Sequence, residues 1–397
     1  MKSQFFFKFF FYISALRLAA DNNNNEIVNI LLSQPGIEIK DSCFKKCNEL
    51  KEITIPSSVM KIGKESFYEC SSLMKVIILS NVPKIETKAF FNCSSLTEVT
   101  IPSSVIEISD YCFSGCKSLV KVILPTSLKV IGSHSFDGCL SLVELTIPSS
   151  VTNVGNSAFE KCQSLKKVEI SSSLEMIDYS TFEGCKSLED LVIPSSIKAI
   201  KHCAFKECKS LKKVEIPNSV VALKQSIFSG CSSLVEVAIP ESIPELDAFT
   251  FNECSSLAKV SLPKSLESIG NCCFNKCNKL EEIVIPVNVK FIGSHAFCHC
   301  ESLKVVNIPP NVTNIDSFTF AECKSLESVS LSDKTIKIEE FAFNNCTSLN
   351  KIVIGDVLCF IGNCAFKGCT MLKEIRIPGK AALKGEIFPE TTKIIKN

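Results

Sequence analysis

Apolar side chains recur along the chain at a constant spacing of 23 residues. In the first repeat, Phe44 stands three residues before Cys47 and Leu50 stands three residues after it, and Ile53 and Ile55 follow at six and eight residues after the Cys. The same step, without an insertion, connects fifteen cysteines: Cys47, Cys70, Cys93, Cys116, Cys139, Cys162, Cys185, Cys208, Cys231, Cys254, Cys277, Cys300, Cys323, Cys346 and Cys369. Positions below are counted from this Cys, so the Phe is at −3 and the Leu at +3. Self-similarity at such a period predicts a repeat architecture.

Each repeat contains the pattern of one short strand. The alternation from +5 to +8 predicts a β-strand with +6 and +8 buried and with +5 and +7 facing solvent. Pro occupies +9 in eleven of the fifteen repeats, as at Pro56 and Pro194. Because Pro cannot donate to a sheet ladder, it ends the strand. Ahead of the Cys, the A-F-x-x-C segment spaces its apolar residues by three, which predicts a single turn of 3₁₀- or α-helix.

One repeat cannot bury its own apolar side, so the repeats must stack around a continuous core. We therefore predict an α/β repeat solenoid with a parallel β-sheet and short helical or 3₁₀ turns. The solenoid should cover residues 41–380, in about 15 repeats. Residues 381–397 become irregular and charged, as an end cap and tail would. Residues 1–40 form a separate, Phe-rich N-terminal segment.

The consensus L-x-x-V-x-I-P-S-S-V-x-x-I-G-x-x-A-F-x-x-C-x-S-L resembles the 23-residue leucine-rich repeat of the BspA-like surface antigens of bacteria and parasitic protists. The resemblance extends over residues 41 to about 380. It implies a leucine-rich-repeat solenoid wound as a right-handed coil. It also implies adhesion or host-protein binding for members displayed on cells. The fold has support from the periodicity as well, whereas the adhesion role comes from the resemblance alone.

The first forty residues allow two interpretations. Residues 1–20 have the basic start, apolar run and small-residue end of a signal peptide, although Lys8 interrupts the run. Residues 15–39 resemble one ankyrin repeat instead, with two apolar segments separated by a polar turn at 21–25. A single ankyrin unit is not stable alone, so it would cap the first solenoid repeat or be the remnant of a longer array. No apolar run in the sequence is long enough to span a bilayer.

Composition excludes several classes of function. The 43 basic and 42 acidic residues give a net charge of +1, which argues against a nucleic-acid-binding or polybasic membrane-surface protein. We find no phosphate-binding Gly loop and no nucleophile–base pair, so we predict no catalytic residues, no cofactor and no enzyme activity.

Trp is absent and only 4 Tyr occur. Since these are common hot-spot residues, binding should be of modest affinity or rely on avidity.

The 23 cysteines allow a disulfide framework or a column of buried thiols. One Cys per repeat, in the same geometry each time, favours buried thiols because no pattern of neighbours favours pairing. So many thiols suit a reducing compartment, which conflicts with the cell surface implied by the resemblance. His295, Cys298, His299 and Cys300 have the residue types of a zinc site. Because Cys300 is the repeat cysteine, its side chain should point into the core, away from the other three residues. We therefore predict no metal site at this group.

The solvent-facing position +5 alternates in charge down the stack. Its residues are Glu52, Lys75, Glu98, Lys121, Glu144, Lys167, Asp190, Lys213, Glu236, Lys259 and Glu282. In a parallel sheet they are cross-strand neighbours, where opposite charges attract. We interpret the alternation as a ladder that fixes register and solubility, each pair contributing about 0.2–1 kcal/mol.

A protein partner is the expected ligand, and the outward face of the sheet is its expected site. The charge ladder stops at Val305 and Ser328, and we expect the uncharged window of Val305, Asn307, Ser328 and Ser330 to contact the partner. Exposed apolar residues at +7 are further candidates on the predicted concave surface: Ile77, Ile123, Val192 and Val284. We predict a non-catalytic, monomeric protein-binding solenoid, either a surface antigen that binds extracellular host proteins or an intracellular scaffold.

Overall fold

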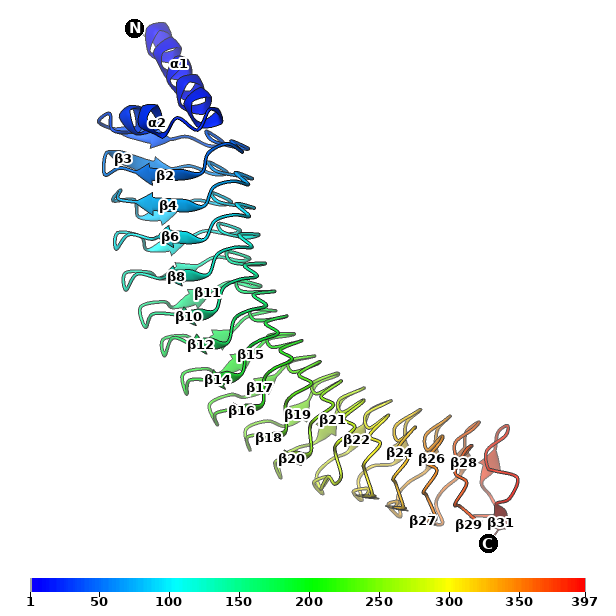
Figure 1. The fold of residues 1–397 in the computed structure, drawn as a ribbon. Helices are drawn as coiled ribbons and strands as arrows, with labels where there is room; N and C mark the ends of the chain where they lie inside the picture. Colours follow the sequence, from blue (N-terminus) through cyan, green and yellow to red (C-terminus); the bar gives the residue numbers. More distant parts are fainter. Residues whose placement is uncertain (1, 397) are drawn as a thin grey trace. The chain divides into compact units, whose positions relative to one another are not determined.

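The computed structural model describes residues 2–396 (Figure 1), and it describes side chains from residue 12 onward. Its residues group into two compact units, an N-terminal unit ending at Ser196 and a C-terminal unit starting at Ile197. Each unit is a parallel β-solenoid in which a repeat contributes one strand to a first sheet and a shorter strand to a second. The predicted repeat solenoid is therefore confirmed.

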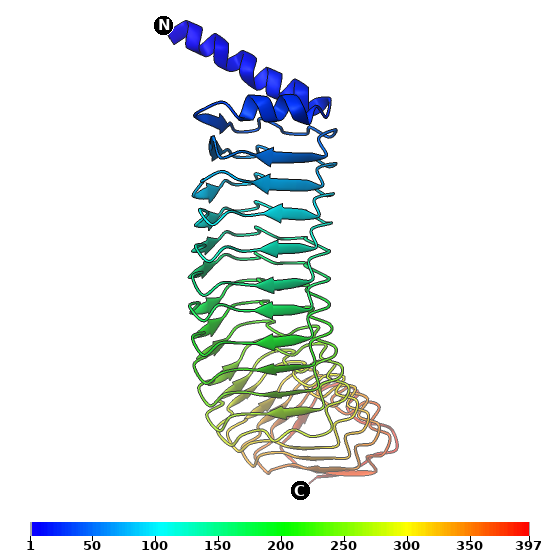
Figure 2. The ribbon, with the colours of Figure 1, turned by 60° about the vertical axis from the view of Figure 1, so that its left-hand side comes forward.

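In the N-terminal unit the strands of each sheet are stacked in the order of the repeats (Figure 2). The first sheet contains β2 (Glu52–Ile55), β4 (Lys75–Ile78), β6 (Glu98–Thr100), β8 (Lys121–Ile123), β10 (Glu144–Thr146), β12 (Lys167–Glu169) and β14 (Asp190–Val192). The second strands are β1 (Ile37–Ile39), β3 (Val59–Ile62), β5 (Lys84–Ile85), β7 (Glu107–Ile108), β9 (Val130–Ile131), β11 (Asn153–Val154) and β13 (Met176–Ile177). Pairing is between residues 23 apart, as for Glu52 and Lys75, so the sequence period sets the register.

The C-terminal unit repeats this arrangement. First-sheet strands are β16 (Lys213–Glu215), β18 (Glu236–Ala238), β20 (Lys259–Ser261), β23 (Val305–Asn307), β25 (Ser328–Ser330), β27 (Lys351–Val353), β29 (Glu374–Ile377) and β31 (Lys393–Lys396). Second strands are β15 (Ala199–Ile200), β17 (Ala222–Leu223), β19 (Glu245–Leu246), β21 (Ser268–Ile269), β22 (Phe291–Ile292), β24 (Asn314–Ile315), β26 (Lys337–Ile338), β28 (Phe360–Ile361) and β30 (Ala382–Leu383). The first sheet is interrupted between β20 and β23, where a single bridge joins Glu282 to Val305, and again between β27 and β29.

The Phe at −3 forms a continuous aromatic column in the core of each unit. From Phe44 to Phe182 successive rings stack at centroid distances of 4.9–5.7 Å. From Phe205 to Phe366 the distances are 5.2–5.8 Å. The rings are almost completely buried. Burial of so many large side chains is the main source of stability in each unit.

The repeat cysteine, from which positions are counted, forms a hydrogen bond as well as filling an apolar position in the core. Its Sγ donates to the carbonyl oxygen of the Phe 26 residues earlier, at 2.9 Å for Cys70 and Phe44 and at 3.3 Å for Cys139 and Phe113. The same contact recurs in the C-terminal unit, as between Cys300 and Phe274 at 3.2 Å. A small thiol therefore fills a core position and satisfies a buried carbonyl of the preceding repeat.

The A-F-x-x-C segment is a turn rather than the helical turn expected from its spacing. It keeps an i→i+3 hydrogen bond, for example from Cys139 N to Phe136 O at 3.2 Å. Residues at −5 and −1 have positive φ, as at His134 (53°) and Lys161 (57°). These left-handed residues reverse the chain on both sides of the Phe, so a helix cannot propagate.

Two helices precede the first strands. Helix α1 (Lys2–Asp21) is followed after a short turn by helix α2 (Asn25–Leu32), and the Asn24 side chain caps α2 by accepting from Ile27 N at 3.1 Å. Leu16, Val28 and Leu32 are buried. The Ser58 hydroxyl donates to the Leu32 carbonyl at 2.8 Å, which ties α2 to the first complete repeat. The pair thus covers the first repeat. Most of the side chains that suggested a signal peptide, those of residues 1–11, lie outside the described ones.

The C-terminal segment continues the core columns. Phe388 stacks on Phe366 at 5.3 Å, and Phe366 N donates to Ile387 O at 2.9 Å. Strand β31 pairs in parallel with β29. Residues after 380 therefore form a shortened repeat that packs on the preceding one.

Candidate protein-binding face

The side chains at +5 and +7 of the first-sheet strands form one solvent-exposed surface in each unit, here called the outer sheet face. In β8, Lys121 and Ile123 are exposed while Val122 between them is buried. The pattern repeats from strand to strand, with few exceptions. This exposure agrees with the predicted alternation.

The charge ladder at +5 is in register, although few of its members are close enough to form ion pairs. Glu98 faces Lys75 and Lys121 across the sheet. Within the described part of the chain, Lys75 and Glu98 form a salt bridge along this ladder at 3.8 Å. Lys167 and Lys213 instead pair with the carboxylate at +7 of their own strand, Glu169 at 2.9 Å and Glu215 at 3.1 Å, and the hydrogen bond to Glu169 raises the pKa of Lys167. The ladder therefore acts mainly through longer-range attraction.

β-Branched side chains form a strip beside the ladder in the N-terminal unit. At +7, five successive strands carry Thr54, Ile77, Thr100, Ile123 and Thr146, here called the β-branched strip. Cross-strand pairing places Thr100 directly between Ile77 and Ile123. Ile123 is 69% exposed. An exposed Ile with no buried role in the fold is available for a partner.

A shallow hollow of about 370 Å³ lies over the end of this strip. It is lined by residues of β8 and β10, including Ile123 and Thr146, and by the following turns with Pro148 and Ser149. Charged Lys121 and Glu144 border it. Hydroxyl groups, an apolar floor and charges of both signs suit a peptide or protein surface. The sequence did not single out this hollow, because the residues of the turn come from a different part of the repeat.

The C-terminal unit has a more polar hollow on its own outer sheet face. It measures about 400 Å³ and is lined mainly by β16, β18 and β20. Lys213, Glu215, Glu236 and Lys259 dominate its exposed edge. Lys213 and Glu215 pair at 3.1 Å, so much of this charge is already compensated.

The structure brings the residues of the uncharged window together. Val305 lies opposite Ser328 and Asn307 lies opposite Ser330 in the paired strands β23 and β25. Val305 is 45% exposed, and Asn307 and Ser330 are exposed while Ser328 is half-buried. The four residues thus form one small patch on the C-terminal unit.

The remaining candidates are dispersed. Ile77 and Ile123 belong to the β-branched strip, with Ile77 half-buried. Val192 is 75% exposed at the end of β14, next to Glu169. Val284 is 83% exposed in the C-terminal unit, where no regular strand forms. Val192 and Val284 therefore belong to neither the strip nor the uncharged window.

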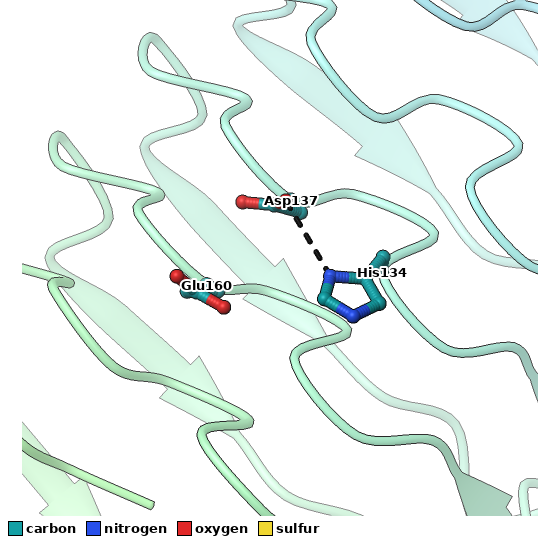
Figure 3. A group of neighbouring side chains, drawn as sticks. All are labelled: His134, Asp137 and Glu160. Atoms are coloured by element: carbon teal, nitrogen blue, oxygen red, sulfur yellow. Dashed lines mark ion pairs between the residues drawn. The ribbon is translucent and has the colours of Figure 1, made fainter. Parts of the chain in front are cut away.

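The residues considered as zinc ligands near residue 300 do not assemble into a ligand group within the described part of the chain. The Cys300 thiol donates into the core, to the Phe274 carbonyl. His295 Nδ1 contacts the Ser294 hydroxyl at 2.8 Å. Among residues 12–396 a different group, His134, Asp137 and Glu160, has potential ligand atoms within 4.8 Å of one another (Figure 3).

Burial controls the chemistry of the thiols. It raises the pKa of Cys70 to about 12 and the pKa of Cys139 well above its ordinary value. Cys203, Cys272 and Cys359 are only half-buried. Because the thiolate is the reactive form, the column thiols are poor nucleophiles and poor metal ligands.

A parallel solenoid of 23-residue units, with Leu at a fixed core position, defines a leucine-rich-repeat protein. The chain belongs to the family of the BspA type leucine-rich repeat region, whose six-copy model matches residues 21–121, 83–212, 175–304 and 290–396. Proteins built from such repeats generally act as non-catalytic scaffolds for protein binding. The match begins inside the helical segment, and the ankyrin resemblance of residues 15–39 is not confirmed.

A solved structure agrees with this assignment. A leucine-rich repeat protein from Bacteroides ovatus is 29% identical, over 91% of this chain and 87% of that protein, with a TM-score of 0.66. The leucine-rich repeat protein of T. pallidum is 30% identical over 41% of this chain and 78% of its own, with a TM-score of 0.39. No curated protein matches the sequence. Within the part of the chain that the structure describes, no helix is long and apolar enough to cross a membrane.

Proposed function

We propose that this chain is a BspA-like surface antigen that binds host or cell-surface proteins through its outer sheet face. The observation that carries the proposal is the β-branched strip, whose exposed Ile123 lies beside a hollow with polar walls. Membership of the family supports a protein-binding role. The adhesion role rests on the resemblance of the repeat to those of surface antigens.

The strip has the composition of a contact that is specific but not tight. Its threonines offer hydroxyl groups, its isoleucines offer apolar area, and the flanking charges alternate in sign. Such a surface can be wetted when free, yet it excludes water at its centre when covered. The strip has no Trp or Tyr, so many weak contacts along the repeats would supply the affinity.

The proposal is tested by the binding of the fluorescently labelled full-length chain to cultured epithelial cells, measured by flow cytometry. Saturable binding that falls at least tenfold in Ile123→Arg supports both the adhesion role and the N-terminal strip as its site. If Val305→Arg abolishes binding and Ile123→Arg does not, the uncharged window is the site instead. An absence of saturable binding to cells and to their isolated surface proteins would reject the adhesion role.

An intracellular scaffold is the second candidate, and the thiol column favours it. The thiols of Cys70, Cys139 and Cys300 each donate a hydrogen bond to a carbonyl. A disulfide at these cysteines would break that hydrogen bond. Mass spectrometry of alkylated protein from its native source separates the two functions. Unpaired cysteines, a retained Met1 and an unmodified Asn311 favour the scaffold. Paired cysteines, a clipped start or a glycan at the exposed Asn311-Val312-Thr313 sequon favour the surface antigen.

A further inference from the structure

Three consecutive repeats place a carboxylate at position −2, namely Asp137, Glu160 and Glu183. This run contrasts with position +5, where the sign of the charge alternates in eleven repeats. Like charges in adjacent repeats repel, and the effect is larger where side chains are partly withdrawn from water. Asp137 and Glu160 are only 24% and 16% exposed. A local excess of partly buried negative charge therefore exists on the turn side of the N-terminal unit.

A histidine completes this group. His134 occupies position −5 of the same repeat as Asp137, and the left-handed backbone at His134 turns its ring toward that carboxylate (Figure 3). Its Nδ1 lies 3.5 Å from Asp137 Oδ2. Glu160 reaches the group from the next repeat, and the potential ligand atoms of all three residues lie within 4.8 Å of one another.

The imidazole is fixed in place, yet one of its nitrogens has no hydrogen bond. His134 stacks on Tyr111 at a centroid distance of 4.6 Å with an interplanar angle of 5°. Its Nδ1 is buried and has no hydrogen-bond partner. A buried polar atom without a partner is costly and calls for an explanation. Burial and the neighbouring Glu160 also raise the pKa of Asp137, and the nearby Lys161 and His134 offset this rise only in part.

The nearest lysine does not satisfy the group. Lys161 pairs with Glu160 through Oε1 at 2.5 Å. This contact leaves the second carboxylate oxygen of Glu160 available. Among the described residues Lys161 forms no hydrogen bond or salt bridge with Asp137 or His134, so one cation partly compensates two carboxylates.

We propose that His134, Asp137 and Glu160 form a binding site for a divalent cation of the zinc type. An imidazole with two carboxylates is a common ligand set for such ions, whereas calcium and magnesium prefer oxygen ligands alone. Ligands at about 2.0–2.2 Å in a tetrahedron lie roughly 3.4 Å apart, close to the separation of His134 Nδ1 and Asp137 Oδ2. The wider separations, up to 4.8 Å, would have to close by rotation of the carboxylate side chains when the ion binds. Partial exposure leaves a fourth position for water.

The bound ion would bridge two successive repeats, since Glu160 belongs to the repeat after His134 and Asp137. No other repeat combines a His at −5 with acidic residues at −2 in its own and the next repeat. His295 also stands at −5, but Cys298 and Ala321 occupy the corresponding −2 positions. His295 therefore provides a matched control with the same backbone conformation and no carboxylate partners.

Isothermal titration calorimetry of the untagged, chelator-treated full chain with ZnCl₂, in the presence of a non-chelating reductant, tests the site. We expect one equivalent to bind, at least tenfold more weakly in His134→Asn and in Glu160→Gln, and unchanged in His295→Asn. Circular dichroism and thermal melting establish that each variant is folded. Absence of binding by the wild-type chain, or an equal loss in His295→Asn, would overturn the proposal.

The absorption spectrum of the Co²⁺-loaded wild-type chain provides a test that needs no variant. Nitrogen and oxygen ligands should give weak visible bands without the intense near-ultraviolet charge-transfer band of a thiolate ligand. A strong charge-transfer band would assign the metal to cysteines and reject the site at His134.

Discussion

At the scale of single residues, the Phe and Cys columns explain the unusual composition of the chain. Each repeat needs one flat side chain that stacks on its equivalents and one small side chain that satisfies the carbonyl of the preceding repeat. Phe136 and Cys139 fill these two positions in the same turn. A substitution in one repeat therefore alters the packing of the two adjacent repeats.

Replacement of Phe136 by Ala should lower the free energy of unfolding by about 3–5 kcal/mol, because it removes a fully buried ring and leaves a cavity between Phe113 and Phe159. Urea denaturation followed by circular dichroism measures the change. Ile123→Ala on the outer sheet face is the control and should change stability by less than about 0.5 kcal/mol. Equal effects of the two substitutions would contradict the aromatic core.

Native thiol labelling should distinguish cysteines by burial. At pH 8, iodoacetamide should modify the half-buried Cys272 and Cys359 long before column thiols such as Cys139, because burial raises the pKa of Cys139 and leaves little thiolate. Peptide mapping by mass spectrometry gives the order of labelling. Rapid labelling of Cys139 in the folded chain would show that the column is accessible.

At the scale of elements, the strand is specified by its own residues and its register by the 23-residue period. Ile53 and Ile55 alternate with exposed Glu52 and Thr54, and the pairing of Glu52 with Lys75 follows from the repeat. These features were predictable from the sequence. The turn at the Phe was not, since left-handed residues such as His134 and Phe318 are not glycines and give no local signal.

The same reasoning explains which parts of the sites were missed. The outer sheet face was predictable because its positions alternate with core residues along one strand. The hollow at Ile123 combines a strand with a turn, and the group at His134 combines positions −5 and −2 of one repeat with −2 of the next. Comparing position −2 between successive repeats would have revealed the run of carboxylates.

Charge reversal on the ladder should affect stability rather than binding. Lys121→Glu places three carboxylates at +5 in successive strands, with Glu98 and Glu144, and should destabilise the chain by about 0.5–2 kcal/mol. The loss should shrink at high salt because these side chains are exposed. Urea denaturation at two salt concentrations measures both effects, and a salt-independent loss would contradict a Coulombic ladder.

Val305→Arg, in contrast to Lys121→Glu, should leave stability nearly unchanged and is a test of binding. The new cation would face Glu282 and extend the alternation, so stability should stay within about 0.5 kcal/mol of the wild type or rise slightly. Cell binding would fall only if the uncharged window contacts the partner. A large loss of stability would show that Val305 has a packing role that its exposure does not indicate.

At the scale of the whole molecule, the many buried thiols should make the free energy of unfolding fall as the pH becomes alkaline. Unfolded thiols titrate near pH 9, whereas burial raises the pKa of the folded column thiols, to about 12 for Cys70. Below pH 9 both states are protonated and the contribution to stability is fully present. Above pH 9 the unfolded chain loses protons that the folded chain retains, so the free energy of unfolding falls as pH rises toward the folded pKa.

Each such thiol should lower the free energy of unfolding by up to about 1.4 kcal/mol per pH unit in this range. With several in each unit, we expect unfolding within about two pH units above pH 9. Urea denaturation under reducing conditions from pH 7 to 11 measures how steeply the free energy of unfolding falls with pH. In Cys139→Ala this fall should be less steep by about 1.4 kcal/mol per pH unit. A constant stability up to pH 10.5 would contradict the buried thiol column.

The central claim is that the outer sheet face is the binding surface, and a comparison of two faces of the N-terminal unit tests it most directly. Cell binding should be compared between Ile77→Arg/Ile123→Arg, on the β-branched strip, and Met60→Arg/Ile106→Arg, at exposed apolar positions on the side of the second sheet. Our account predicts at least tenfold weaker binding for the first pair and wild-type binding for the second. Equal binding by both variants, or a loss confined to the second pair, would contradict it.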